Sequence, residues 1–255
     1  METNQKIQLT KYLAHCGLSS RRKVTDLINE GLIAINGAIV KNPSERIDPT
    51  ARITCQGKVV RPEKKIYILL NKPEGYVSSL SDPNNERTVM ELVNLPGKQR
   101  IYPVGRLDQD TTGVLIMTND GDLAQQLAHP RFARKKVYHA VIDRALHERD
   151  LEKIRNGITL RDGRVKADRA YFVQGKGRHH IGIELHSGRY HIIRRIFMHL
   201  GYHVGKLDRV AYSSLTKRGV TKGNWRYLTQ EEVAMLHAPE TVHTPTKRNS
   251  DSRSK

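Results

Sequence analysis

Two regions of patterned sequence, separated by a short polar segment, constrain the fold of this 255-residue chain most strongly. The separating segment, residues 61–65, reads Arg-Pro-Glu-Lys-Lys, and its charge and proline are typical of a linker. Each flanking region is long enough to form its own hydrophobic core. We therefore expect a small domain over residues 1–62 and a larger domain over residues 63–238. Apolar residues are rare over residues 239–255, which predicts a disordered basic tail.

The small N-terminal region is predicted to combine two helices with short strands. Leu9 and Leu13 lie four residues apart, as they would on one face of a helix. A second helix is expected over residues 21–30, where apolar residues again follow helical spacing. Asn36-Gly37 and Gln56-Gly57 each separate two apolar runs, and such pairs favour β-hairpins. The result is a helix-helix-strand domain.

A large excess of positive charge points to a polyanionic partner. Lys and Arg number 44 against 26 acidic residues, a net charge of +18 at pH 7. Solubility and attraction to a membrane surface are alternative explanations, but no apolar span or amphipathic membrane helix is visible, so nucleic acid is favoured. Arg21, Arg22 and Lys23 open the second helix, where free backbone N–H groups also attract phosphate. A solvated basic face fits the spacing of these three residues equally well.

Cysteine and histidine usage gives no sign of a metal site. Cys16 and Cys55 are too few and too far apart for a cysteine-based zinc site or a disulfide framework. The histidines between residues 186 and 203 match no metal-binding motif, so we expect surface or RNA-facing side chains. The first residues lack the apolar core of a secretory signal, and a cytoplasmic protein is expected.

The larger region interleaves strands and helices without a regular βαβ spacing. Strands are predicted over residues 66–70, 114–117, 137–142 and 181–185, and helices over residues 122–127 and 192–200. This order favours an α+β fold over a doubly wound sheet.

The segment from Gly105 to Gly113 holds the densest group of reactive side chains. It contains Arg106, Asp108 and several hydroxyl residues, and it precedes the buried strand predicted at residues 114–117. Loops between core strands are where rigid scaffolds present reactive groups. On the local pattern alone, a structural turn capped by Asp108, with Arg106 in a surface pair, is equally compatible.

Several ordered blocks make the chain resemble the RsuA-like branch of the RNA pseudouridine synthases, over nearly its full length up to Leu236. The N-terminal region also resembles the small S-four-like RNA-binding domain shared with a ribosomal small-subunit protein. The catalytic blocks are Asn71-Lys72-Pro73-x-Gly75-x-Val77-Ser78-Ser79, Gly105-Arg106-Leu107-Asp108-x-x-Thr111-x-Gly113, Lys136-x-Tyr138, Gly188-Arg189-Tyr190-His191-Ile192-Ile193-Arg194-Arg195 and Leu207-x-Arg209. Ordered blocks across one chain are far more specific than any single block.

The resemblance implies a catalytic domain with a mixed, mostly antiparallel sheet and an isomerase that converts uridine to pseudouridine. It implies that Asp108 is the nucleophile and that Arg194 is the partner of this carboxylate. The reaction breaks the bond from ribose to the uracil nitrogen, turns the base and rejoins ribose to carbon, and a carboxylate can attack or stabilise the sugar carbon. The residues do not choose between attack on the sugar and a glycal route. A fixed guanidinium charge keeps a carboxylate ionised in a closed pocket.

The resemblance also assigns the surrounding residues. Tyr138 would stack on the extruded uracil, and Leu185 with its neighbours would exclude water. Arg106 is a further candidate for substrate binding, and Arg195 is expected to contact RNA. No cofactor and no metal are implied. The expected partner is a structured stem-loop of ribosomal RNA, with large-subunit RNA slightly favoured and a monomer as the default.

Two other classes of function remain open from the sequence. A non-enzymatic RNA-binding or ribosome-assembly protein could keep the same fold, although it would have little reason to retain both Asp108 and Arg194. A glycosidase acting on nucleosides would share the carboxylate chemistry, but it would have no use for the N-terminal domain.

Overall fold

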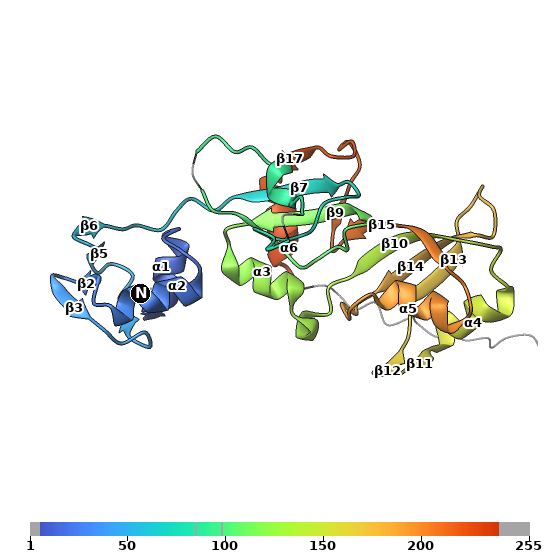
Figure 1. The fold of residues 1–255 in the computed structure, drawn as a ribbon, viewed down its shortest axis with the longest axis horizontal. Coiled ribbons are helices and arrows are strands. Elements are labelled where there is room, and N and C mark those ends of the chain that lie inside the picture. The colour runs from blue at the N-terminus through green and yellow to red at the C-terminus, as the bar shows by residue number, and fades with distance from the viewer. Residues whose placement is uncertain (1–5, 85, 98, 240–255) are drawn as a thin grey trace, which may run out of the picture.

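The structure is a computed structural model, which describes residues 6–84, 86–97 and 99–239. An N-terminal module lies at one end of the molecule and is joined by an extended segment to a larger sheet domain (Figure 1). Within the described ranges, no helix combines the length and apolarity needed to cross a membrane. The predicted basic tail falls, except for Pro239, outside these residues.

The N-terminal module packs two helices against small sheets. It contains α1 (Leu9–His15), α2 (Arg21–Asn29), the pair β1 (Ile7–Gln8) with β4 (Arg46–Ile47), and a sheet in the order β3 (Ala38–Val40), β2 (Ile33–Ile35), β5 (Ile53–Cys55), β6 (Lys58–Val59). Asn36 and Gly37 have φ angles of +50° and +90°, as a tight hairpin turn requires. Leu9, Leu13 and Ile28 are fully buried in the core of the module. The predicted helices and hairpins are therefore present.

The larger domain is built on a nine-stranded sheet. Its strands are β7 (Tyr67–Lys72), β8 (Tyr102–Pro103), β9 (Thr111–Thr118), β10 (Lys136–Ile142), β13 (Arg169–Phe172), β14 (His180–Leu185), β15 (Val204–Tyr212), β16 (Leu215–Thr216) and β17 (Trp225–Tyr227). The strand order is β13-β14-β10-β15-β9-β7-β17, with β16 beside β15 and β8 beside β9. The β15–β9 pair is parallel, and the other pairs described in this sheet are antiparallel. The mixed, mostly antiparallel α+β class is confirmed.

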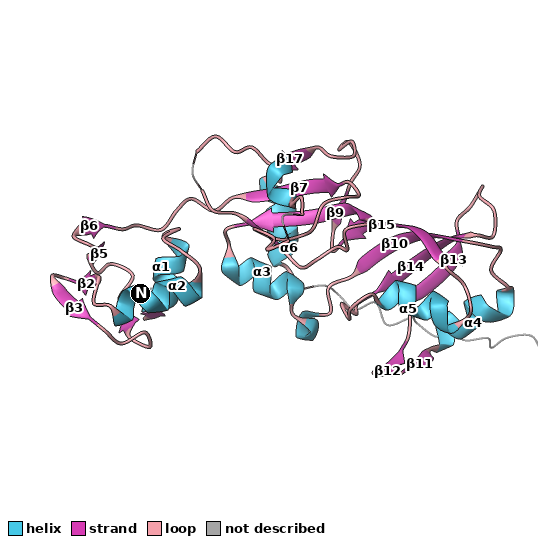
Figure 2. Cartoon of the chain, in the orientation of Figure 1, coloured by secondary structure: helices cyan, strands magenta, loops and turns pink. Residues whose placement is uncertain are grey.

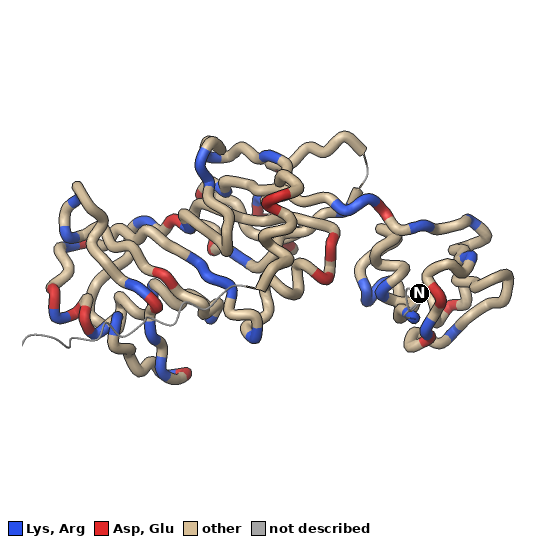
Figure 3. The backbone as a smooth tube through the Cα atoms, turned by 180° about the vertical axis from the view of Figure 1, so that it is seen from behind, with Lys and Arg blue, Asp and Glu red and all other residues tan. Residues whose placement is uncertain are grey.

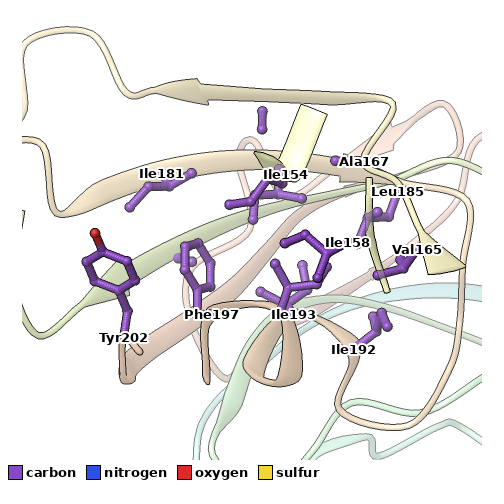
Figure 4. Close-up of a cluster of buried hydrophobic side chains, with 14 of the residues drawn as sticks. Ile154, Ile158, Val165, Ala167, Ile181, Leu185, Ile192, Ile193, Phe197 and Tyr202 are labelled. Atoms are coloured by element: carbon purple, nitrogen blue, oxygen red, sulfur yellow. The ribbon is translucent and has the colours of Figure 1, made fainter. Parts of the chain in front are cut away.

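Helices cover the two halves of this sheet separately (Figure 2). The remaining elements are α3 (Gly121–Ala128), α4 (Glu148–Asn156), α5 (Ile192–His199), α6 (Gln230–His237), the 3-10 turns η1 (Val89–Leu92) and η2 (Pro130–Phe132), and the hairpin β11 (Ile158–Leu160) with β12 (Gly163–Val165). α4 and α5 bury their apolar residues against the half that contains β10, β13 and β14 (Figure 4). α3 and α6 pack on the half that contains β7 and β9.

Strand β9 lies in the interior of the sheet, between β15 and β7. All eight of its residues are buried, because Val114 and Ile116 enter one core while Leu115 and Met117 enter the core on the opposite face. This explains its continuous apolar run, which is typical of a strand covered on both faces. Gly113 pairs with Arg209 of β15, and a Cβ at Gly113 would lie 2.2 Å from the Arg209 carbonyl oxygen. Only glycine permits this close approach, and it occurs immediately after the reactive loop.

Candidate active site

A buried lysine, Lys72, holds the loop that carries Asp108 in place. Lys72, at the end of β7, has no exposed surface. Its ammonium donates to the carbonyl oxygens of Pro73, Asp108, Gln109 and Thr111 at 2.8–3.1 Å. A buried cation with several backbone acceptors fixes the path of both chain segments. The segment that begins at Lys72 therefore supports the loop that carries Asp108.

Two further contacts hold these two segments together. The Ser78 hydroxyl donates to the Leu107 carbonyl at 3.0 Å and accepts from the Leu107 amide at 3.1 Å. The amide of Gly75 donates to the Gln109 carbonyl at 2.9 Å. Hydrogen bonds to their backbone groups thus fix the residues on both sides of Asp108. The carboxylate therefore projects from a rigid loop.

The Asp108 carboxylate faces two cationic or polar side chains from the start of α5. Arg194 Nε lies 3.8 Å from Asp108 Oδ2, and His191 Nε2 lies 3.2 Å from Asp108 Oδ1. The Thr111 hydroxyl is 3.5 Å from Oδ2. The structure therefore brings together Asp108 and Arg194, which are separated by 86 positions in the sequence.

Arg194 is held in place by contacts on both ends of its guanidinium. Its Nη1 donates to the Val204 carbonyl at 2.9 Å, and its Nη2 lies 2.8 Å from Oδ2 of the more exposed Asp110. Ile193 and Phe197 on the other face of α5 are buried in the core (Figure 4). Ile196 is buried there too, and together these contacts fix the rotation of the helix. Arg194 is therefore a positioned charge shared between two carboxylates.

A cavity of about 130 Å³ opens at Asp108. Tyr138 from β10 and the exposed Arg106, both predicted to bind substrate, are among its lining residues. Lys136 and Arg209, both nearly buried, also contribute to the lining. The cavity is thus an acid-bearing hollow with an aromatic wall and basic groups around it.

Leu185 occupies a different place from the one expected. It is fully buried in the core beneath α5 (Figure 4) and is absent from the residues that the structure describes around the cavity. It lies opposite Lys136 in the β14–β10 register. Paired residues of adjacent strands point to the same face of the sheet, so Leu185 lies on the face of Lys136 and Tyr138, within the α4–α5 core next to the cavity. Ile192 and Ile193 provide the apolar lining instead.

The residues predicted to contact RNA differ in whether their side chains already have an acidic partner. Arg21, Arg22 and Lys23 are exposed at the start of α2, where Ser20 caps the helix by accepting from the Lys23 amide. Arg195 instead forms a two-pronged ion pair with Asp162, with Nη1 at 3.0 Å from Oδ2. Basic positions occur on both the N-terminal module and the sheet domain (Figure 3). The α2 cluster is therefore free to meet phosphate, whereas Arg195 already has an acidic partner.

Two site residues escaped the sequence reasoning. His191, expected to be an ordinary surface or RNA-facing side chain, contacts Asp108 and lines the cavity. Its φ of +47° places it immediately before α5 in a conformation that turns it toward the loop. Lys72 has a detectable signal, because the polar pair Asn71-Lys72 ends the apolar run from Tyr67 to Leu70. Among the described residues, no group of three His, Cys, Asp or Glu side chains could hold a metal ion.

The chain is similar in sequence and in structure to known proteins. The sequence signature of the RNA pseudouridylate synthase family matches residues 66–199, and that of the S4 domain matches residues 9–53. An uncharacterised RNA pseudouridine synthase of Aquifex aeolicus is 37% identical over 95% of this chain and 99% of its own. The ribosomal large subunit pseudouridine synthase B of Bacillus subtilis is 37% identical over 91% of this chain and 96% of its own. A crystal structure of a pseudouridylate synthase has a TM-score of 0.64 and 27% identity, covering 90% of this chain and 99% of the other.

Proposed function

The chain belongs to the RNA pseudouridylate synthase family, whose members are isomerases, and on this premise we propose that it converts a specific uridine of ribosomal RNA to pseudouridine. The observation that carries the proposal is the Asp108 carboxylate at the mouth of the cavity, with Arg194 and His191 beside it. We further propose that the division into domains lies between residues 62 and 63, so that an RNA-binding domain precedes a catalytic one.

Asp108 is proposed to act at the sugar of the extruded nucleotide. The bond between ribose C1′ and uracil N1 breaks, the base turns, and a bond forms between C1′ and C5. The C5 proton leaves to solvent and N1 gains a proton, so no atom is lost overall. Addition to the sugar and proton removal towards a glycal both use the carboxylate of Asp108, which faces the Arg194 guanidinium. Tyr138 provides the face on which the base rests while it turns.

The large ribosomal subunit is the proposed source of the target. The Bacillus subtilis relative is named for that subunit and shares 37% of its residues with this chain. Mapping pseudouridines in ribosomal RNA from cells with and without the protein tests this choice. One position should lose its modification in large-subunit RNA, whereas a loss confined to small-subunit RNA would reassign the substrate.

Removing residues 1–60 should weaken RNA binding more than it slows the chemical step. This module carries nine basic and five acidic residues, a net charge of +4, and its exposed α2 cluster is proposed to contact phosphates. Its loss should raise KM and flatten the dependence of KM on salt concentration, because fewer counterions are released on binding. Single-turnover rates at saturating RNA should stay within a few-fold of wild type. A large drop in that rate would place the module in the chemistry itself.

The rate should fall as pH rises through about 8, because Lys72 then loses its charge. Burial lowers the pKa of Lys72 to about 8, whereas the nearby Asp108 and Asp110 carboxylates raise it. A neutral amine has two N–H groups for four carbonyls, so the hold on the Asp108 loop weakens.

The stability of the folded protein should instead increase as pH rises through the same range. Between pH 8 and 10.5, Lys72 is protonated in the unfolded chain but neutral in the folded protein. The free energy of unfolding of wild type should therefore rise with pH over this range, relative to that of Lys72→Met.

Both pH effects are read against the Lys72→Met variant. The variant should show no inflection in rate near pH 8. An identical inflection in the variant and in wild type would assign the pH dependence to another group.

A further inference from the structure

A second hollow lies beside the cavity at Asp108, between α5 and the first residues of β15, and His191 lines both hollows. Its volume is about 450 Å³, within the range of roughly 300–1,000 Å³ that is typical of small-molecule sites. We call it the α5–β15 groove. It is lined by Asp143, His191, Arg194, Arg195, Met198, His203, Val204 and Gly205.

The groove presents an exposed apolar surface. Met198 is 63% exposed, although Ile192, Ile193, Ile196 and Phe197 on the other face of α5 are all buried. Gly205 is also exposed and leaves the floor of the groove open. A flexible, polarisable thioether at such a place suits contact with a flat aromatic ring.

The groove is continuous with the candidate active site. His191 lines both hollows, and its Nε2 lies 3.2 Å from Asp108 Oδ1. Arg194 forms part of the groove wall, and its Nε lies 3.8 Å from the same carboxylate. The ring of the exposed Tyr190 stacks on the His191 ring with centroids 3.8 Å apart. The His191 and Arg194 side chains therefore lie between the groove and the Asp108 carboxylate.

Hydrogen bonds hold the walls of the groove in place. Arg194 Nη1 donates to the Val204 carbonyl at 2.9 Å, which ties α5 to β15. Asp143 Oδ1 accepts from the His203 amide at 3.0 Å, and the Asp143 amide donates to the His203 carbonyl at 2.9 Å. These contacts fix both sides of the hollow, so the groove is preformed in the protein alone.

We propose that the α5–β15 groove binds the base of the nucleotide next to the target uridine. The inference rests on the proposed function and names a second subsite for the same RNA. Extrusion of the target uridine leaves its neighbour without one stacking partner. Because the groove is separated from Asp108 by the His191 and Arg194 side chains, the base next to the target uridine is the part of the RNA expected to reach it. Asp143 at the groove wall is paired with Arg144, so its carboxylate is neutralised beside the RNA.

The test uses full-length protein and a synthetic RNA hairpin that carries the mapped uridine. An abasic nucleotide is placed on the 5′ or the 3′ side of that uridine. With wild-type protein, one of these substitutions should raise KM and the Kd for RNA about tenfold, the usual scale for loss of one stacked base. The other substitution should have a smaller effect.

Gly205→Val fills the groove without disturbing the strand. A Cβ at Gly205 meets the Val141 carbonyl oxygen at 3.7 Å, an ordinary contact, and valine suits a β-strand. This variant should raise KM about tenfold on intact RNA, and the abasic substitution should then have no further effect. Additive effects of the two changes would overturn the assignment of the groove to that base.

Met198→Ala provides a second variant, with Met235→Ala as its matched control. Met235 is 56% exposed on α6, in a distant part of the sheet domain. Met198→Ala should raise KM three- to tenfold, and Met235→Ala should leave it unchanged. Absence of turnover by wild type would contradict the proposed function. The Kd values would still show whether the groove binds the neighbouring base. Equal Kd for intact and both abasic RNAs would overturn the inference alone.

Discussion

Asp108→Asn should lower kcat for pseudouridine formation by on the order of 10⁴-fold or more, the scale seen when a nucleophile is removed. Asparagine keeps the shape of the side chain but removes the negative charge that acts at the sugar. The backbone contacts on either side of the residue, from Ser78 and Gly75, do not involve the carboxylate and should persist. RNA affinity should therefore stay within a few-fold of wild type. Single-turnover kinetics and RNA binding measure the two quantities separately.

Asp110→Asn is the matched control for this change. Asp110 stands two positions further along, its side chain is 67% exposed, and it also pairs with Arg194. An exposed ion pair contributes about 0–1 kcal/mol, so this variant should keep kcat within about tenfold of wild type. Comparable losses in the two variants would mean that the loop needs acidic charge in general, with no special role for Asp108.

Lys72→Met should produce the second largest loss, in both rate and stability. The ammonium of Lys72 donates to four carbonyl oxygens around the Asp108 loop. A hydrogen bond from a charged donor contributes about 1.5–3 kcal/mol. Methionine also removes the cost of burying the charge, which offsets part of the lost hydrogen bonding. We therefore expect a net loss of roughly 3 kcal/mol in the free energy of unfolding. Because the loop then positions Asp108 less well, kcat should fall about 100-fold.

Lys222→Met controls for the loss of a lysine near the same loop. Lys222 pairs with Glu74 at the surface, 3.0 Å apart and with both side chains more than half exposed. Its replacement should change the unfolding free energy by less than about 0.5 kcal/mol. Chemical denaturation and single-turnover rates should show the difference between the two lysines. A Lys72→Met protein with wild-type kcat would show that the loop holds its shape without this anchor.

The elements best predicted from sequence are those whose signal is local. Asn36-Gly37 specifies a hairpin because both residues accept positive φ, and β9 is visible as an apolar run because it is covered on both faces. The helix predicted at residues 192–200 ends one residue earlier, at His199. Asp108, Arg106, Tyr138 and Arg194 were reached through ordered blocks, and the structure places all four at or beside the cavity.

The elements that sequence reasoning missed depend on long-range contacts. β15 carries Lys206, Asp208 and Arg209 among its apolar residues, so it shows no clean alternation. Asp208 is explained by the Thr112 hydroxyl, 2.8 Å away on the neighbouring strand, a contact between residues 96 positions apart. His191 could not be assigned to the site because its approach to Asp108 depends on where α5 begins.

The Asp108 carboxylate, held in a rigid loop beside Arg194, is proposed to be the group that isomerises a uridine in ribosomal RNA. The most direct measurement maps pseudouridine in ribosomal RNA from cells that lack the protein and are supplied with wild type, Asp108→Asn or Asp110→Asn. Wild type and Asp110→Asn should restore the modification at one uridine, and Asp108→Asn should leave that position as uridine. Full restoration by Asp108→Asn, at matched protein levels, would contradict the account.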